Sequence, residues 1–411
     1  MTTGLRFFYR HIFVTGLENI PSQGPVIIIA NHNSSLMDAA LLGILLKRRA
    51  WFFARGDVFV NKPVQKILGW LHMMPVHSHQ GGRNTLQANS NSFSAAQKIL
   101  SQGGVIVFFP ESYSHTEHHL LPFRKGVFRL AFDTAVAKNF SFDIPVVPIG
   151  ITYDHPTAGG TAASVHAGKP ILLSAYQTDY EKSPAVAVLH ICKDSWQEME
   201  KLVLHIADQN RLQTADNYCT VSRNNHLPGR AWKVASSEKL AREQAICKEI
   251  SQAAPDDFED KKSKTNRYFD ALSSASVTDR TASGKRVVST GKKILLLLGF
   301  PIFFIGLMLN GLPVLLARRI ADKKVKRKDF YSWIFVVCYS FNYLFWLMIV
   351  FAIGALAFNW MYAGGILLVL VASGLFAYVY QNWLHDNRQQ AKWKSLSASR
   401  IAELQTMRNS L

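Results

Sequence analysis

The stretch PVIIIANHNSSLMDAALLGILL, residues 25–46, decides the fold class of this chain. Its apolar run 25–30 predicts a buried strand, and Ala39–Leu46 predicts a helix. His32 and Asp38 therefore lie where a strand passes into a helix, a common place for active-site groups in α/β proteins. A neutral His there can take a proton from a hydroxyl, and a carboxylate can fix its tautomer.

No G-x-S-x-G sequence lies near this pair, so it predicts a base that acts on a substrate hydroxyl without a covalent acyl-enzyme. For an isolated His–Asp pair the competing interpretation is helix capping with surface polarity. The other motifs of the chain favour chemistry.

Charge and hydropathy narrow the class of partner. The 411 residues carry 46 Lys and Arg against 28 Asp and Glu, a formal charge of +18. That excess suits anionic lipid surfaces, phosphorylated substrates or acidic carrier proteins. Because 48% of the residues are hydrophobic, the chain is unusually apolar for a nucleic-acid binder, and we expect no nucleic-acid partner.

The cysteines and the N-terminus indicate an intracellular protein without a metal site. The four cysteines lie far apart and form no zinc set, which fits a reducing compartment. The first 22 residues lack the apolar core and cleavage site of a secretory signal. We expect a packed first helix there.

Three regions differ in composition. Residues 1–210 alternate apolar and helical stretches, which predicts an α/β fold with a mixed sheet sandwiched by helices. Residues 211–292 are polar and predict a helical or flexible linker. Residues 293–411 predict a membrane region with a basic tail. The expected strands are 26–30, 51–54, 73–76, 105–109, 144–151 and 171–174, and the expected helices include 92–102 and 125–138.

The membrane region holds two uncharged runs. Tyr331–Leu384 lacks Asp, Glu, Lys and Arg over 54 residues, which fits two spans, because one crossing takes about 20 residues. We expect the turn near 359–365. The run 294–317 has basic flanks on both sides, and basic flanks favour the cytoplasm. We therefore expect a re-entrant segment there, with the catalytic domain on the cytoplasmic side of the cell membrane.

Three further motifs follow strand candidates. The first is FPESYSH, in which Glu111 comes just past a strand. The second is LLPFRKGV, in which Lys125 precedes the start of a helix, where backbone N–H groups can bind a phosphate. The third is IPVVPIG, residues 144–150, whose prolines predict a sheet edge or the wall of a groove. Taken alone, the first motif favours a turn with an exposed acid and the second favours a solvated lysine.

Together, in this order, these segments resemble the glycerol-phosphate and lysophospholipid acyltransferase family over residues 10–205. Five residues separate His32 from Asp38, and F-P-E-x-x-S-H precedes L-L-P-x-x-x-G. This spacing looks like the glycerol-3-phosphate and dihydroxyacetone-phosphate acyltransferase branch. The resemblance implies that His32 is the general base and that Asp38 orients it. It also implies that Phe109, Pro110 and Glu111 shape the acceptor site and that Pro148 lines the acyl side.

Two departures from the family concern the acceptor. Ser112 stands where the family has Gly in F-P-E-G. The strand end Met74-Pro75-Val76 lacks the Arg that usually follows it, so Arg83, His77 or Lys125 would have to replace it.

The resemblance implies transfer of an acyl group from an acyl carrier protein or coenzyme A thioester to glycerol-3-phosphate or its 1-acyl product, without metal or resident cofactor. Expected partners are membrane lipids and acyl carrier protein; the oligomeric state stays open. The alternative is a degenerate acyltransferase domain that serves as a membrane-associated lipid-binding scaffold. Intact His32 and Asp38 oppose that alternative, whereas Ser112 and the missing Arg favour it weakly.

Overall fold

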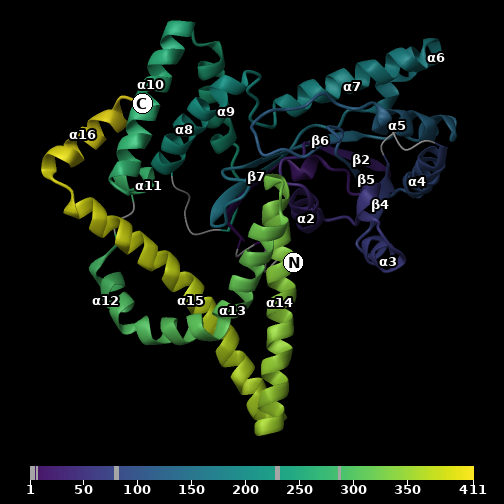
Figure 1. Cartoon of the computed structure of the whole chain (residues 1–411). Coiled ribbons are helices and arrows are strands. Elements are labelled where there is room, and N and C mark those ends of the chain that lie inside the picture. The colour runs from purple at the N-terminus through teal and green to yellow at the C-terminus, as the bar shows by residue number, and fades with distance from the viewer. Residues whose placement is uncertain (1–4, 6–7, 78–82, 227–231, 286–287) are drawn as a thin grey trace. The chain divides into compact units, whose positions relative to one another are not determined.

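The computed structural model describes residues 5, 8–77, 83–226, 232–285 and 288–411, with only the backbone of 83–86. The chain forms two compact units. Unit 1 comprises Met1–Ala207 and Arg230–Gln244, and unit 2 comprises Asp208–Gly229 and Ala245–Leu411. Figure 1 labels the elements.

Unit 1 is built on one mixed sheet, with eight strands among the described residues in the order β4-β3-β5-β2-β6-β7-β1-β8. All neighbouring pairs are parallel except β6 and β7, which are antiparallel. The strands are β1 (Tyr9–Thr15), β2 (Val26–Ala30), β3 (Ala50–Arg55), β4 (Met73–Val76), β5 (Val105–Phe108), β6 (Val146–Tyr153), β7 (Thr161–Ala167) and β8 (Lys233–Val234). The predicted mixed α/β sheet is confirmed.

The core of unit 1 explains why these segments are strands. Every residue of β2 and of β6 is buried, as expected for near-continuous apolar strands inside a parallel sheet. Ile27 and Ile29 of β2 lie in a core cluster with buried residues of three helices. The α-helices of unit 1 up to residue 200 are α2 (Leu36–Leu45), α3 (Lys62–Trp70), α4 (Arg83–Ser101), α5 (Gly126–Val136), α6 (Gln177–Lys182) and α7 (Pro184–Glu200). Buried side chains of α4, α5 and α7 complete that cluster.

Three local predictions differ from the structure. A first helix was expected within residues 1–22; Leu5 and Phe8 are helical, but from Tyr9 on the chain is strand β1, almost entirely buried between β7 and β8. Residues 171–174 make only an isolated bridge, Val146 to Ile171, before a 3-10 turn. Of the two interpretations of 144–150, the sheet edge is wrong, because β6 lies between β2 and β7, and the groove wall stays a prediction. The carbonyl of Pro148 accepts from the amide of Gly168, which lies just beyond the end of β7. Because the nitrogen of a strand residue points to the same side as its carbonyl, the missing amide of Pro148 also faces a position past the end of β7, and no hydrogen bond of the β6–β7 ladder is lost.

The polar segment expected to be a linker, 211–292, contributes to both units. It supplies β8 to the sheet of unit 1 and three helices to unit 2. These are α8 (Gln209–Asn225), α10 (Pro255–Ser274) and α11 (Asp279–Ala282); α9 (Glu238–Gln252) begins in unit 1 and ends in unit 2.

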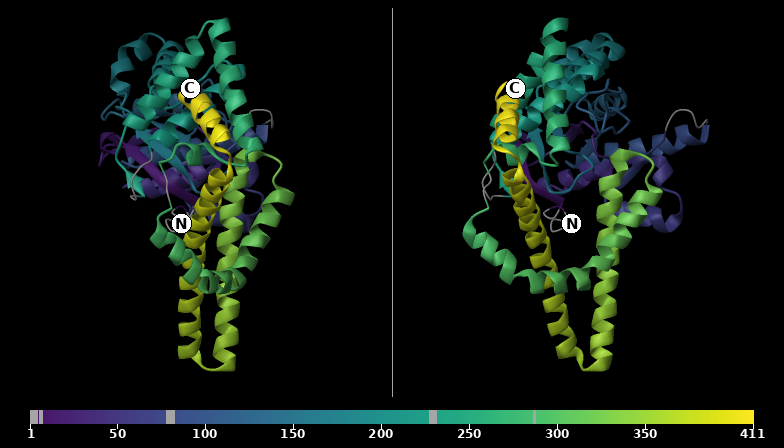
Figure 2. Two further views of the ribbon diagram at one scale, coloured as in Figure 1. Left: turned by 90° about the vertical axis from the view of Figure 1, so that its left-hand side faces the viewer. Right: turned by 60° about the vertical axis from the view of Figure 1, so that its left-hand side comes forward.

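Three helices of unit 2 are long and apolar enough to cross a membrane: α13 (Phe300–Lys324), α14 (Lys328–Ala357) and α15 (Trp360–Ser395). They contact one another, and α14 and α15 form the long hairpin seen in Figure 2. The chain reverses at Asn359, whose side chain caps α15 by accepting from the amides of Met361 and Tyr362 at 3.0 Å each. The remaining helices of unit 2 are α12 (Thr290–Leu298) and α16 (Ala398–Asn409).

Helix α13 continues through Pro313 because a neighbour replaces the lost hydrogen bond. A proline cannot donate to the carbonyl four residues earlier, here that of Leu309. The indole Nε1 of Trp346 on α14 donates to that carbonyl at 2.8 Å. The re-entrant path expected for 294–317 stays a prediction.

Candidate active site

The candidate site lies at the carboxyl edge of the sheet, where four parallel strands end together. Strands β4, β3, β5 and β2 are adjacent and parallel. The loop with His32 follows β2, and the loop with Glu111 follows β5, the next strand. In open α/β sheets ligands bind outside this edge.

His32 and Asp38 form the pair that the sequence predicts. His32 Nδ1 lies 2.8 Å from Asp38 Oδ2, and Asp38 is completely buried in the first turn of α2. With Nδ1 donating to the carboxylate, the Nε2 lone pair is the one left to accept a proton. The side chain of His32 keeps 20% exposure, so its ring reaches solvent while its partner does not.

Asp38 is fixed by two further donors. The backbone amide of Ser34 donates to Oδ2 at 2.9 Å, and the hydroxyl of Tyr153 donates to Oδ1 at 2.6 Å. Burial, followed by the charge of Asp38, raises the pKa of Tyr153 well above its usual value, so Tyr153 remains a donor. Sequence reasoning missed Tyr153, which lies 115 residues away from Asp38 at the end of β6.

Asn31 ties the loop to β6. Its Nδ2 donates to the carbonyl of Ile151 at 2.8 Å, and its Oδ1 accepts from the amide of Ile151 at 2.6 Å. The same Nδ2 lies 2.7 Å from Asn33 Oδ1. These two hydrogen bonds extend the pairing of β2 with β6 through the side chain of Asn31, and they fix the backbone just before His32.

Glu111 holds the two loops together. It is buried, and its Oε1 accepts from the backbone amide of His32 at 3.0 Å. Its Oε2 accepts from the amide of Leu121 and lies 3.1 Å from His115 Nε2. The backbone amide of His115 in turn donates to the carbonyl of His32 at 3.1 Å. Through these contacts Glu111 fixes the backbone of the His32 loop relative to the loop after β5.

Opposing effects act on His115. Burial lowers its pKa, but the hydrogen bond to Glu111 and the charge of that carboxylate outweigh burial, and the net pKa is raised.

The other residues of this motif differ in their surroundings. The ring of Phe109 stacks on that of His32 with centroids 4.2 Å apart and planes 20° from parallel. Pro110 is buried, and its carbonyl accepts from the amide of Arg124 at 2.8 Å. Ser112 is exposed and has φ 66°, the left-handed conformation that favours Gly. Ser112, which stands where the family has Gly, therefore occupies a backbone position at which a side chain is strained.

The residues proposed to replace the missing Arg lie on or next to three different elements. Lys125 is exposed at the N-cap of α5, one residue after Arg124. His77 packs its ring over Gly56, and Asn89 bonds both of its backbone groups. Arg83 begins α4, and its side chain lies outside the described residues. Pro148 is buried in β6 against Gly168.

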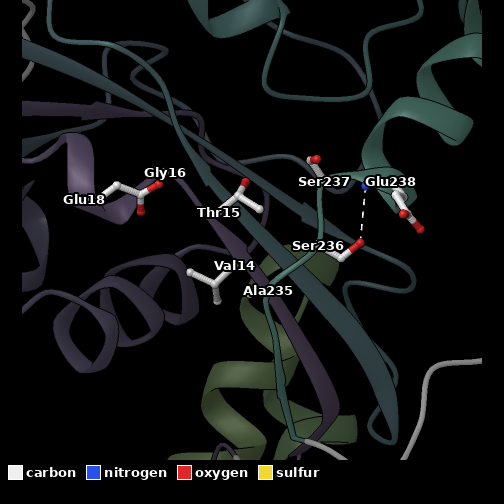
Figure 3. A pocket seen from close by; sticks show the side chains of 8 residues that line it. All are labelled: Val14, Thr15, Gly16, Glu18, Ala235, Ser236, Ser237 and Glu238. Carbon is white, nitrogen blue, oxygen red and sulfur yellow. Dashed lines mark hydrogen bonds between the residues drawn. The ribbon is translucent and has the colours of Figure 1, made fainter.

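A hollow of about 360 Å³ lies elsewhere in unit 1, at the carboxyl end of β1. Figure 3 shows Thr15 and Glu18 on one side of it and Ser236 and Glu238 on the other. Thr15 Oγ1 lies 2.6 Å from Nδ1 of His166, which is buried. Burial, and then the charge of Lys239, lowers the pKa of His166 to about 4. Because β6 and β7 separate β1 from β2 in the sheet, this hollow is distinct from the His32 loop.

Comparison with known proteins identifies the family that part of this chain matches. The acyltransferase family model matches residues 11–152, the segment that supplies His32, Asp38 and Glu111. Residues 11–152 belong to the acyltransferase family. The chain is 30% identical over 138 residues to a chloroplastic 1-acyl-sn-glycerol-3-phosphate acyltransferase of Brassica napus, covering 33% of this chain and 36% of that protein.

Two more proteins match part of this chain. Glycerol-3-phosphate O-acyltransferase 2 of Saccharomyces cerevisiae is 32% identical over 106 residues, covering 26% of this chain and 14% of that protein. The crystal structure of the 1-acyl-sn-glycerophosphate acyltransferase of Thermotoga maritima is 20% identical with a TM-score of 0.34, covering 46% of this chain and 72% of that one. The chain thus spans well under half the length of these two curated relatives.

Proposed function

We propose that this protein transfers a fatty acyl group from a thioester to the hydroxyl of glycerol-3-phosphate or 1-acyl-glycerol-3-phosphate in phospholipid synthesis. The observation that carries the proposal is the His32–Asp38 pair at 2.8 Å, with Asp38 buried and bonded to Tyr153. The relatives from Brassica napus and Saccharomyces cerevisiae are each named for one of these two acceptors.

In the proposed mechanism His32 Nε2 removes the proton of the acceptor hydroxyl as its oxygen attacks the thioester carbonyl. The tetrahedral intermediate expels the thiolate, and the imidazolium returns the proton to that sulfur. Asp38 stabilises the imidazolium and fixes the tautomer, while Tyr153 and Ser34 hold Asp38. The acyl group thus exchanges a C–S bond for a C–O bond, and no metal or resident cofactor takes part.

The donor and the membrane side are also part of this proposal. Coenzyme A and acyl carrier protein are both acidic carriers, and the charge of +18 favours either. Exposed basic residues lie where α13 ends and α14 begins, and they favour the cytoplasmic side for that connection. They are Lys323, Lys324, Lys326, Arg327 and Lys328.

The test is acyl transfer by the purified, detergent-solubilised chain. Each thioester donor is offered with each of the two acceptors. Lyso-product from glycerol-3-phosphate would assign the first acylation, and activity only on the 1-acyl acceptor would assign the second. His32→Ala must lose the activity. His190→Ala is the matched control, because His190 makes a similar 3.0 Å contact with Asp179 on the surface of unit 1. Absence of acyl transfer with every donor–acceptor pair would overturn the proposal and favour a lipid-binding scaffold without catalytic activity.

A further inference from the structure

Helix α3 exposes an apolar surface in unit 1. None of its residues is buried, although amphipathic helices normally turn their apolar side to a core. The exposed large side chains on and beside it are Val60 at 72%, Ile67 at 52%, Trp70 at 69% and Leu71 at 51%. Large apolar side chains grouped in this way indicate a contact surface.

The order of residues along α3 separates two faces. With about 3.6 residues per turn, Val64, Ile67, Leu68 and Leu71 fall on one side. Lys62 and Lys66 fall on the opposite side, with Gln65 beside them. Val64 and Leu68 are only half-exposed, and α3 packs against β4, so the free part of the apolar stripe is at Ile67 and Leu71.

Trp70 lies at the boundary between these faces. The ammonium of Lys66 lies 5.4 Å from the centroid of its ring. An aromatic ring at the boundary, lysines on the polar side and aliphatic side chains on the other are typical of helices that lie in a membrane interface.

The chain also ties unit 1 to a bilayer. Unit 2 of the same chain holds three helices long and apolar enough to cross a membrane. An additional interfacial contact on unit 1 then costs little entropy, because the bilayer is already at high effective concentration. The two lysines favour an anionic surface over a neutral one.

We propose that α3 docks unit 1 on an anionic phospholipid bilayer, with Ile67, Trp70 and Leu71 entering the interface and Lys62 and Lys66 meeting the headgroups. Helix α3 follows β3, which ends at the same sheet edge as the His32 loop. The docking rests on exposure and charge and does not depend on the proposed activity.

The experiment uses the full chain with Cys338→Ser, because the other three cysteines are buried. Cysteine is introduced at Ile67 or, as the matched control, at the exposed Gln65, and is labelled with an environment-sensitive fluorophore. The protein is reconstituted in phosphatidylcholine–phosphatidylglycerol vesicles whose acyl chains carry bromine quenchers. We expect the label at 67 to lose most of its fluorescence and the label at 65 to keep it.

A second variant tests the charge. Lys62→Glu with Lys66→Glu should weaken docking by about fivefold per lysine on anionic vesicles and restore the fluorescence of the label at 67. Absence of quenching at 67, or equal quenching at 65 and 67, would overturn docking. Unchanged quenching in the charge-reversed variant would overturn the anionic preference. Acyl transfer is measured separately, so its failure would leave these readings intact.

Discussion

Two regions of this protein bury polar side chains with satisfied hydrogen bonds, and they use them differently. In the loop after β2, Asp38 accepts from Ser34 and Tyr153 and pairs with His32. In the middle of α13, Asn310 Nδ2 donates to the carbonyls of Gly306 and Leu370, and its Oδ1 accepts from Tyr343.

The difference lies in what each network leaves open. The network of Asp38 ends at a partly exposed imidazole, whose second nitrogen can exchange a proton. The network of Asn310 links α13 to α14 and α15 and closes on itself, which is how polar side chains hold membrane helices together. In the proposed function, the same kind of bonding therefore supports chemistry in one region and packing in the other.

The largest expected effect comes from Asp38→Asn. The amide keeps the shape of the carboxylate but no longer stabilises the imidazolium or its tautomer, so kcat should fall on the order of 10³ to 10⁴-fold. Steady-state rates in the acyl-transfer assay measure this. Asp179→Asn, at the surface pair with His190, should leave kcat unchanged. A loss below tenfold for Asp38→Asn would remove the distinction between the two regions.

Tyr153→Phe should have a smaller effect of the same kind. It removes one donor from a buried carboxylate, and hydrogen bonds to charged groups contribute about 1.5–3 kcal/mol. We expect kcat to fall about tenfold, with part of the cost appearing as lower thermal stability. In the double variant Tyr153→Phe with Asp38→Asn, the loss of kcat should not exceed that of Asp38→Asn alone. Tyr176→Phe, which breaks a similar 2.7 Å contact with Asp194, is the control and should keep full activity.

Tyr343→Phe tests the membrane side of the comparison. Loss of its hydroxyl contact with Asn310 should cost about 0.6 kcal/mol of stability, the average for polar contacts between membrane helices. Unfolding of the reconstituted chain in denaturant measures this cost, and kcat should be unchanged. Tyr339→Phe, one turn earlier on α14, should cost less. A large loss of turnover in Tyr343→Phe would show that this network also serves catalysis.

Ser112→Gly should have the smallest effect, and it should raise the free energy of unfolding where the other variants lower stability or activity. Relief of the left-handed strain, about 1–2 kcal/mol, exceeds the added flexibility of Gly, about 0.5–1 kcal/mol. The variant should therefore gain roughly 0.5 kcal/mol in thermal unfolding. Ser22→Gly, at an exposed loop position without positive φ, should not gain stability. Destabilisation by Ser112→Gly would show that the hydroxyl makes a contact worth more than the strain.

The sequence predicted those parts of the site that are local. His32 and Glu111 come shortly after the apolar strands β2 and β5, and Asp38 lies in the first turn of the helix that follows β2, so periodicity places them at one sheet edge. Tyr153 was missed because its contact with Asp38 joins distant segments, and the expected strand stopped at Ile151.

The missed strands have physical causes as well. In β1 the polar Arg10 and His11 interrupt the apolar pattern although His11 is buried. In β7, Thr161–Ala167, small residues give weak strand propensity, and pairing with β6 and β1 decides the conformation. Helices α14 and α15 were predictable because an uncharged run of 54 residues has few other structures. Helix α13 comes from the other uncharged run, 294–317, for which we expected a re-entrant segment.

The most direct test of the central claim is the turnover of His32→Ala in the acyl-transfer assay, with its thermal unfolding measured in parallel. Without the base, kcat should fall by roughly 10³-fold or more while unfolding stays cooperative at a similar temperature. Turnover within tenfold of the wild-type rate, in a protein that unfolds like the wild type, would contradict the assignment of His32 as the base.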